Sequence, residues 1–178
     1  ILKHLKLRAD ITRYIREFFY ENGYLEVETP IRIPNPIPEE HIDPFESEGW
    51  YLQSSPEICM KRLAAQGYDK IFQICKCFRK DERGDRHLTE LTMLEWYRKG
   101  YSYIELMDEC SNMIRYVADK LISNKTNARS SSMSNVIKNR LHENGLYIDY
   151  GSNNILLSSE WEKITVSGAF EKYAAISM

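Results

Sequence analysis

Apolar positions in the first third of the chain change from a helical to an extended spacing. From Leu5 to Asn22 they recur every three or four residues, which predicts an amphipathic helix that Gly23 ends. Tyr24 to Thr29 alternates apolar and acidic residues, as expected for a strand ahead of Pro30. Residues 31–49 are rich in proline and predict an extended loop, followed by a short strand over Trp50–Gln53.

A helix and two longer strands are predicted in the middle of the chain. Ser54 and Glu57 have the spacing of a capping box, which would start a helix that runs to Ala65. Lys70 to Arg79 and Leu91 to Arg98 then alternate as strands do, and the charged loop 80–90 joins them. We therefore expect a hairpin here.

The last part of the chain begins with a long helix and then becomes polar. Ser102 and Glu105 form a second capping box, and apolar residues spaced three and four apart predict a core stripe: Met107, Cys110, Ile114, Val117 and Leu121. Residues 123–135 are rich in Ser and Asn and predict a mobile loop or linker. A short helix over 136–143, a hairpin about 151–154 and a helix over 167–176 should follow. We thus expect a core over residues 1–122, the linker, and a continuation of the same core over 136–178.

Composition narrows the classes of function. The net charge is −2 and the pI is near 6.1, so the chain lacks the basic character of proteins that bind nucleic acid over a large surface. Since no apolar run approaches the roughly 18 residues of a membrane span, we expect no membrane segment and a cytoplasmic protein.

The four cysteines are too few and too irregularly spaced for a disulfide framework. Cys75 and Cys77 should face the same side of their strand. A CxC pair can bind metal, but no His/Cys partner pair with zinc-site spacing accompanies it. We therefore predict buried thiols and no metal ligand.

One face of the predicted hairpin combines small, polar and charged residues. The alternation puts Gln73, Cys75, Cys77 and Arg79 on one face of the first strand, and Leu91, Met93, Glu95 and Tyr97 on one face of the second. This mixture suggests the lining of a pocket. A guanidinium such as Arg79 binds carboxylate or phosphate through parallel donors, and Glu82, Arg86 and His87 in the loop could bind polar groups of a ligand. The alternative is a surface hairpin whose charges pair with each other.

Three segments resemble the class II aminoacyl-tRNA synthetases. Residues 78–98, with Phe78-Arg79-x-x-Glu82 and a TMLEWYR run, resemble motif 2, most closely that of the lysyl branch. Residues 18–30 resemble motif 1, the family's dimer-forming element, and residues 54–63 resemble the TSPExxMKRLL segment before motif 2. Within this branch the chain is most similar to the stand-alone paralogues that attach lysine or β-lysine to elongation factor P. The resemblance implies an α+β fold, in which helices flank an antiparallel sheet that is incomplete at its C-terminal end.

The resemblance also implies roles for individual residues. Arg79 would be the catalytic residue, holding the substrate carboxylate and the α-phosphate of ATP while an aminoacyl-adenylate forms. Glu82, Arg86, His87 and Leu91 would complete the ATP site, and magnesium would bridge the phosphates. Glu57 and Glu95 would bind the ammonium groups of lysine or β-lysine, and Tyr97 its side-chain amine. The implied acceptor is elongation factor P or tRNA, and the implied assembly is a homodimer through the motif 1 region.

Each of these roles has a structural alternative. Glu57 could serve only as the capping partner of Ser54, Glu95 could pair with Lys76 or Lys99, Tyr97 could simply pack, and His87 could be an ordinary exposed loop residue. Leu91 stands where the family has a phenylalanine that stacks on adenine, which predicts weak ATP affinity because base stacking contributes about 1–3 kcal/mol in other nucleic-acid sites.

The family's Gly-rich motif 3 has no counterpart before Met178. A non-catalytic binding or dimerisation module, or a truncated fragment of a lysyl-tRNA synthetase, is therefore the alternative to an adenylating ligase.

Overall fold

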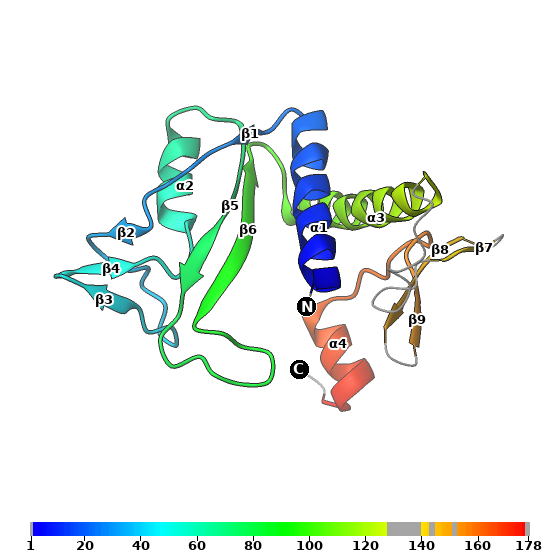
Figure 1. Cartoon of the computed structure of the whole chain (residues 1–178). Helices are drawn as coiled ribbons and strands as arrows, with labels where there is room; N and C mark the ends of the chain where they lie inside the picture. Colours follow the sequence, from blue (N-terminus) through cyan, green and yellow to red (C-terminus); the bar gives the residue numbers. More distant parts are fainter. Residues whose placement is uncertain (1, 128–139, 143–144, 151–152, 177–178) are drawn as a thin grey trace. The chain divides into compact units, whose positions relative to one another are not determined.

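A computed structural model describes residues 2–127, 140–142, 145–150 and 153–176 of the chain (Figure 1). The chain forms two compact units. The first comprises Ile1–Ile15 with Met107–Met178, and the second comprises Arg16–Leu106. The predicted boundaries at 122 and 135 differ from this division, and the linker between them stays a prediction.

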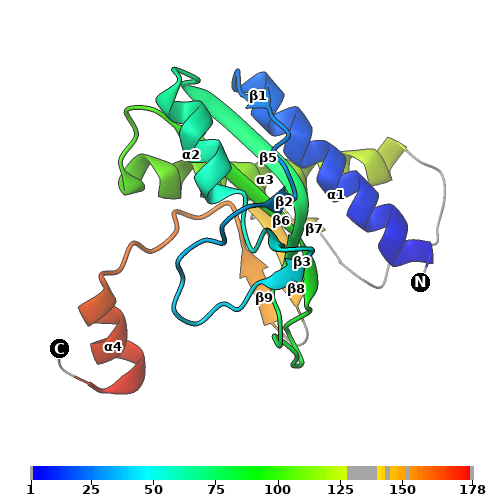
Figure 2. The same ribbon diagram turned by 90° about the vertical axis from the view of Figure 1, so that its left-hand side faces the viewer.

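The second unit is built on the hairpin of β5 (Lys70–Phe78) and β6 (Glu90–Arg98). The two strands pair antiparallel over their full lengths, from Lys70 opposite Arg98 to Phe78 opposite Glu90. β1 (Leu25–Glu26) adds to β5 in parallel, which gives a sheet of order β1-β5-β6. Helix α2 (Glu57–Ala65) packs against both long strands, as Figures 1 and 2 show from two directions. The predicted hairpin is confirmed.

An aromatic cluster fixes the hairpin to the end of α1 (Leu2–Glu21). Phe19 and Phe72 are fully buried and stack at a centroid distance of 4.7 Å. Trp96 lies 5.5 Å from the Phe19 ring on the same face of the sheet as Phe72, its cross-strand partner. Aromatic packing thus covers this face of the hairpin at Phe72 and Trp96.

Short strands replace part of the predicted proline-rich loop. β2 (Arg32–Ile33) and β3 (Phe45–Ser47) both pair antiparallel with β4 (Trp50–Leu52), in a sheet of order β2-β4-β3. The prediction of a single extended loop over 31–49 is therefore wrong at both ends. The strand predicted over Tyr24–Thr29 is only two residues long, because the chain leaves the edge of β5 after Val27 donates to the Phe72 carbonyl at 2.9 Å.

The first unit contains α3 (Tyr103–Asn127) from Met107 onward, and also β7 (Arg140–His142), β8 (Gly145–Tyr150), β9 (Asn153–Leu156) and α4 (Val166–Ala174). The sheet order is β7-β8-β9. One core cluster joins Tyr14 of α1 to Val117 and Leu121 of α3, and another joins α3 to the small sheet through Ala118, Ile122, Leu146 and Leu157.

Several predictions for residues 102–178 are confirmed and others are corrected. The capping box of Ser102 and Glu105 forms, and the hairpin of β8 and β9 and the last helix are present. The core stripe is wrong at Met107, which is 41% exposed. Helix α3 continues through residues 123–127, and residues 128–135 of the predicted linker lie outside the described residues. Arg140–His142 is a strand and not part of the helix that was predicted over 136–143. The other residues of that predicted helix lie outside the described residues.

Candidate functional site

The mixed face of the hairpin forms as the alternation predicts. The strand register places Gln73 opposite Glu95, Cys75 opposite Met93, and Cys77 opposite Leu91. Tyr97 lies on the same face, opposite the buried Ile71. We call these residues, together with Arg79, the site face.

Glu95 is the most ordered charged group on the site face. Its side chain is half-buried, and each carboxylate oxygen accepts one hydroxyl: Ser55 Oγ donates to Oε2 at 2.8 Å, and the Tyr97 hydroxyl donates to Oε1 at 2.6 Å. Burial, and next the hydrogen bond to Glu95, raise the pKa of Tyr97 above its ordinary value. Tyr97 therefore remains a protonated donor at any physiological pH.

The proposed structural partners of Glu95 are engaged elsewhere. Lys76 pairs with Glu90 at 2.7 Å, and Lys99 pairs with Asp69 at 3.4 Å. The alternative in which Glu95 serves as their ion-pair partner is therefore wrong. A half-buried carboxylate oriented by two neutral donors keeps its negative charge available for a cation.

Ser55 is a site residue that sequence reasoning missed. Its hydroxyl also accepts the backbone N–H of Glu57 at 3.0 Å, so it supports both the first turn of α2 and Glu95. The predicted capping box between Ser54 and Glu57 does not form, because Pro56 is the N-cap residue and the Glu57 side chain turns to Lys61 instead. The structural alternative for Glu57, as a capping partner of Ser54, is thus wrong as well.

Lys61 is the resident cation near these acids. Its ammonium makes an (i, i+4) ion pair with Glu57, and that hydrogen bond is the main cause of its raised pKa. Glu95 raises the pKa of Lys61 further through its charge. The Lys61 side chain is 59% exposed, so its ion pair with Glu57 contributes little to stability.

Arg79 lies directly after β5, where the hairpin loop starts. Its backbone N–H donates to the Thr89 carbonyl at 2.9 Å, its Nε donates to the Ser54 carbonyl at 3.4 Å, and its Nη1 lies 3.8 Å from the Glu82 carboxylate. The structure thus brings Arg79 and Glu82 together. Both side chains are about one-quarter exposed, so the guanidinium still has a face toward solvent.

The other residues predicted for ATP lie further along the hairpin. Arg86 and His87 are exposed in a tight turn, in which the His87 N–H donates to the Gly84 carbonyl at 3.2 Å. Leu91 is partly buried on the site face beside Cys77. These positions fit a polyphosphate, because a guanidinium and an imidazole there can donate to phosphate oxygens. Their roles stay a prediction.

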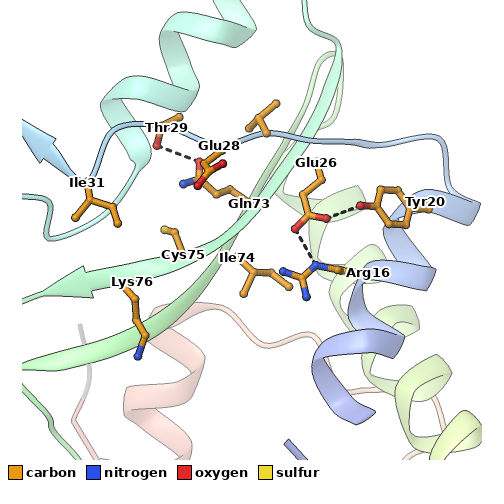
Figure 3. Close-up of a pocket in the computed structure, with 11 residues that line it drawn as sticks. Arg16, Tyr20, Glu26, Glu28, Thr29, Ile31, Gln73, Ile74, Cys75 and Lys76 are labelled. Carbon is orange, nitrogen blue, oxygen red and sulfur yellow. Dashed lines mark hydrogen bonds and ion pairs between the residues drawn. The ribbon is translucent and has the colours of Figure 1, made fainter. Parts of the chain in front are cut away.

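A cavity of about 580 Å³ opens between β5 and the chain segment that includes α1 and the residues after it (Figure 3). Residues 73–76 of β5 line it. Glu26 lies between Arg16 and Tyr20 there; Arg16 Nε donates to it at 2.8 Å and the Tyr20 hydroxyl donates to its other oxygen. Thr29 donates to the buried Gln73 amide oxygen at 3.0 Å. Except for Cys75 and Gln73, the lining residues belong to neither the site face nor the hairpin loop, so this cavity differs from the predicted site.

The described residues contain neither a cluster of His, Cys, Asp and Glu ligands for a metal ion nor a membrane-spanning helix. No group of three or more His, Cys, Asp or Glu side chains there could hold a metal ion, so we assign magnesium no protein ligand. In the same part of the chain, no helix is both long enough and apolar enough to cross a bilayer. Cys77 is buried as predicted, whereas Cys59, Cys75 and Cys110 are only partly buried, and all four are free thiols.

One family model matches the chain along nearly all of its length, and known proteins match about two-thirds of it. The family model described as tRNA synthetases class II (D, K and N) matches residues 1–177. An elongation factor P–(R)-β-lysine ligase of Pseudoalteromonas translucida is 43% identical over 125 residues, which cover 65% of this chain and 39% of the ligase. The ligase of the same name from Vibrio atlanticus is 42% identical over 126 residues, with the same coverage. The chain thus spans about two-fifths of the length of these relatives.

The structure is also similar to a solved synthetase. The crystal structure of a Leishmania major protein described as an aspartyl-tRNA synthetase matches with a TM-score of 0.58 and 22% sequence identity. The match covers 67% of this chain and 24% of that protein. It supports the expected α+β fold of class II synthetases.

Proposed function

Because the chain belongs to the tRNA synthetases of class II (D, K and N), we propose that its β5–β6 hairpin and the start of α2 activate lysine or β-lysine with ATP. The relatives that are about 42% identical over two-thirds of the chain are named elongation factor P–(R)-β-lysine ligases, which favours a lysine of elongation factor P over tRNA as the acceptor. The proposal includes a homodimer through the motif 1 region, residues 18–30.

The observation that carries the proposal is the Glu95 carboxylate. It is half-buried, it is oriented by the hydroxyls of Ser55 and Tyr97, and the lysines nearest to it along β5 and β6 pair with other acids. Glu57 is a second acid at the start of α2. A dicationic amino acid requires more than one negative partner when it leaves water, and this pair supplies two.

Arg79 and the hairpin loop would hold the nucleotide. Arg79 would neutralise the substrate carboxylate and the α-phosphate, which brings the two reacting groups together. Glu82 would accept a hydrogen bond from the adenine amino group, Arg86 and His87 would bind the outer phosphates, and Leu91 would contact the base. Magnesium would supply further positive charge on the phosphates when it is bound.

Lysine-dependent ATP–pyrophosphate exchange by the full-length gene product tests this proposal. We expect exchange with lysine or (R)-β-lysine, and a loss of about 100- to 1,000-fold in kcat for Arg79→Ala, the range for removal of one preorganised donor to a developing charge. Glu95→Gln should instead raise KM for the amino acid strongly and leave KM for ATP nearly unchanged, because its charge faces the ammonium groups.

Glu90→Gln is the matched control. It makes the same change of charge on the same strand, but Glu90 lies on the opposite face and pairs with Lys76. Its exchange rate should equal that of the unmodified protein. Absence of exchange with every lysine isomer would overturn the enzymatic proposal, and equal effects of Glu95→Gln and Glu90→Gln would overturn the amino-acid site.

A further inference from the structure

Three sulfur atoms meet on the site face of the hairpin. Cys75 Sγ lies 3.8 Å from Cys77 Sγ, and Cys77 Sγ lies 3.9 Å from Met93 Sδ. Met93 is the direct cross-strand partner of Cys75, so the strand register itself holds the three side chains together. Cys77 is fully buried, whereas Cys75 and Met93 are partly buried.

The two distances from Cys77 Sγ match the sulfur–sulfur separation in a three-coordinate metal site. Metal–sulfur bonds of about 2.3 Å, the length in zinc thiolates, separate the sulfurs of a trigonal site by about 4 Å. Two thiolates and a thioether are soft ligands, which select Cu(I) over harder cations. Zinc prefers four ligands in a tetrahedral arrangement, and no cluster of His, Cys, Asp and Glu among the described residues supplies them.

We propose that Cys75, Cys77 and Met93 form a binding site for one Cu(I) ion. Two thiols bind the ion as thiolates, so their two protons pass to the solvent and the charge of the site changes from zero to minus one. The three ligands lie on the site face beside groups that we assign to lysine and ATP, since Leu91 is the cross-strand partner of Cys77. The proposal nevertheless rests on the positions of the sulfur atoms and not on the proposed ligase function, and metal binding tests it separately.

The surroundings of Cys75 suit a thiolate ligand. The Gln53 side-chain amide donates to Cys75 Sγ at 3.5 Å and to the Lys76 carbonyl at 2.9 Å, which fixes its orientation. The pKa of Cys75 is lowered, mainly by the hydrogen bond from Cys77, while that bond and burial raise the pKa of Cys77. The Gln53 amide and the hydrogen bond between the two sulfurs thus both favour the thiolate form of Cys75.

An ion can reach the sulfurs from the cavity beside β5. Cys75 is one of the residues that line this cavity, as Figure 3 shows, and the cavity is large enough to admit a small chelate. The buried Cys77 and the neighbouring Met93 then complete the coordination from the interior.

Anaerobic titration with Cu(I) against a chromogenic Cu(I) chelator tests the proposal. We expect one ion per chain, with the ultraviolet absorption of a thiolate–Cu(I) bond. Since loss of an outer-shell group already costs about 10- to 100-fold in metal affinity, Cys75→Ser and Cys77→Ser should each weaken binding by more than about 100-fold. Met93→Leu, which conserves volume, should weaken it by about 10-fold or more.

Cys59→Ser and Cys110→Ser are the matched controls, because these free thiols lie outside the cluster. Both should bind Cu(I) as the unmodified chain does. If Cys77→Ser does not fold, the Cu(I) affinities of Cys75→Ser and Met93→Leu still test the three-sulfur site. Failure of the unmodified chain to compete with the chelator, unchanged binding in Cys75→Ser, or unchanged binding in Met93→Leu would each overturn the three-sulfur site.

Discussion

The hydroxyl of Ser55 connects two parts of the candidate site. It accepts the Glu57 N–H at the start of α2 and donates to the Glu95 carboxylate on β6. Both bonds are within 3.0 Å, and Ser55 itself is buried. One small side chain thus fixes where the helix begins relative to the acid that we assign to the substrate ammonium.

Replacement of Ser55 by alanine should therefore destabilise the protein. Loss of a side-chain acceptor at the first turn of a helix typically costs about 0.5–2 kcal/mol, and a half-buried carboxylate that loses a donor adds to this, so we expect about 2 kcal/mol. Urea unfolding followed by circular dichroism measures the change. Ser54→Ala removes a neighbouring buried hydroxyl and should cost less; an equal loss in both variants would contradict the assignment to Ser55.

The sequence pattern could not show which of the two adjacent serines, Ser54 or Ser55, supports the start of α2. The S-x-x-E spacing selects Ser54, whereas the folded chain has its N-cap at Pro56 and uses Ser55. Two adjacent serines offer the same chemistry, and only the position of Glu95 across the tertiary fold distinguishes them. Glu95 and Tyr97 lie on one face as predicted, because period-2 geometry depends on the local backbone alone.

Helix α1 ends through the backbone conformation of Gly23. Its φ is +75°, its N–H donates to the Tyr20 carbonyl at 3.0 Å, and the Tyr24 N–H donates to the Phe19 carbonyl at 3.0 Å. These bonds turn the chain so that Tyr24 packs against Phe19 with ring centroids 5.0 Å apart. The helix end therefore helps to shape the aromatic core under the hairpin.

Gly23→Ala should lower the free energy of unfolding by about 1 to 2 kcal/mol, the usual cost of left-handed backbone for a residue with a Cβ. The added Cβ would lie 3.9 Å from Lys70 Nζ, an ordinary contact, so the cost comes from the backbone alone. Thermal unfolding measures it. Gly84→Ala, at a glycine outside the left-handed region, should leave stability nearly unchanged; similar losses in both would argue against backbone strain at Gly23.

Long elements were predictable and short ones were not. α1, β5, β6 and α3 each extend over enough residues for a period to repeat. β2 has two residues and β3 three, within a proline-rich segment, and both exist because β4 offers hydrogen bonds on its two edges. Such strands depend on tertiary partners, which no local pattern encodes.

At the scale of the whole molecule, charge distinguishes between possible acceptors. The chain has 24 basic and 26 acidic residues, and these give a net charge of −2. Affinity for nucleic acid depends on neutralising phosphates with lysine and arginine, and this balance leaves no excess of positive charge for that purpose. This charge balance is consistent with the protein acceptor that we propose.

We expect the chain to bind unmodified tRNA with a Kd weaker than about 10⁻⁴ M at physiological salt, the weak limit of nonspecific nucleic-acid binding. Fluorescence anisotropy of labelled tRNA measures this, with a full-length lysyl-tRNA synthetase as the positive control. Micromolar binding that weakens steeply with added salt would contradict the expectation and would favour tRNA as the acceptor.

The uninterrupted pairing of β5 with β6 limits which insertions and deletions the hairpin can accept. Substitutions on the site face alter one contact at a time. An insertion or deletion of one residue between Leu91 and Glu95 would instead move Glu95 and Tyr97 to the aromatic side, and Trp96 to the ligand side. The number of residues in this strand is therefore constrained more strictly than most of their identities, and variation in length must be confined to the loop from Lys80 to Thr89.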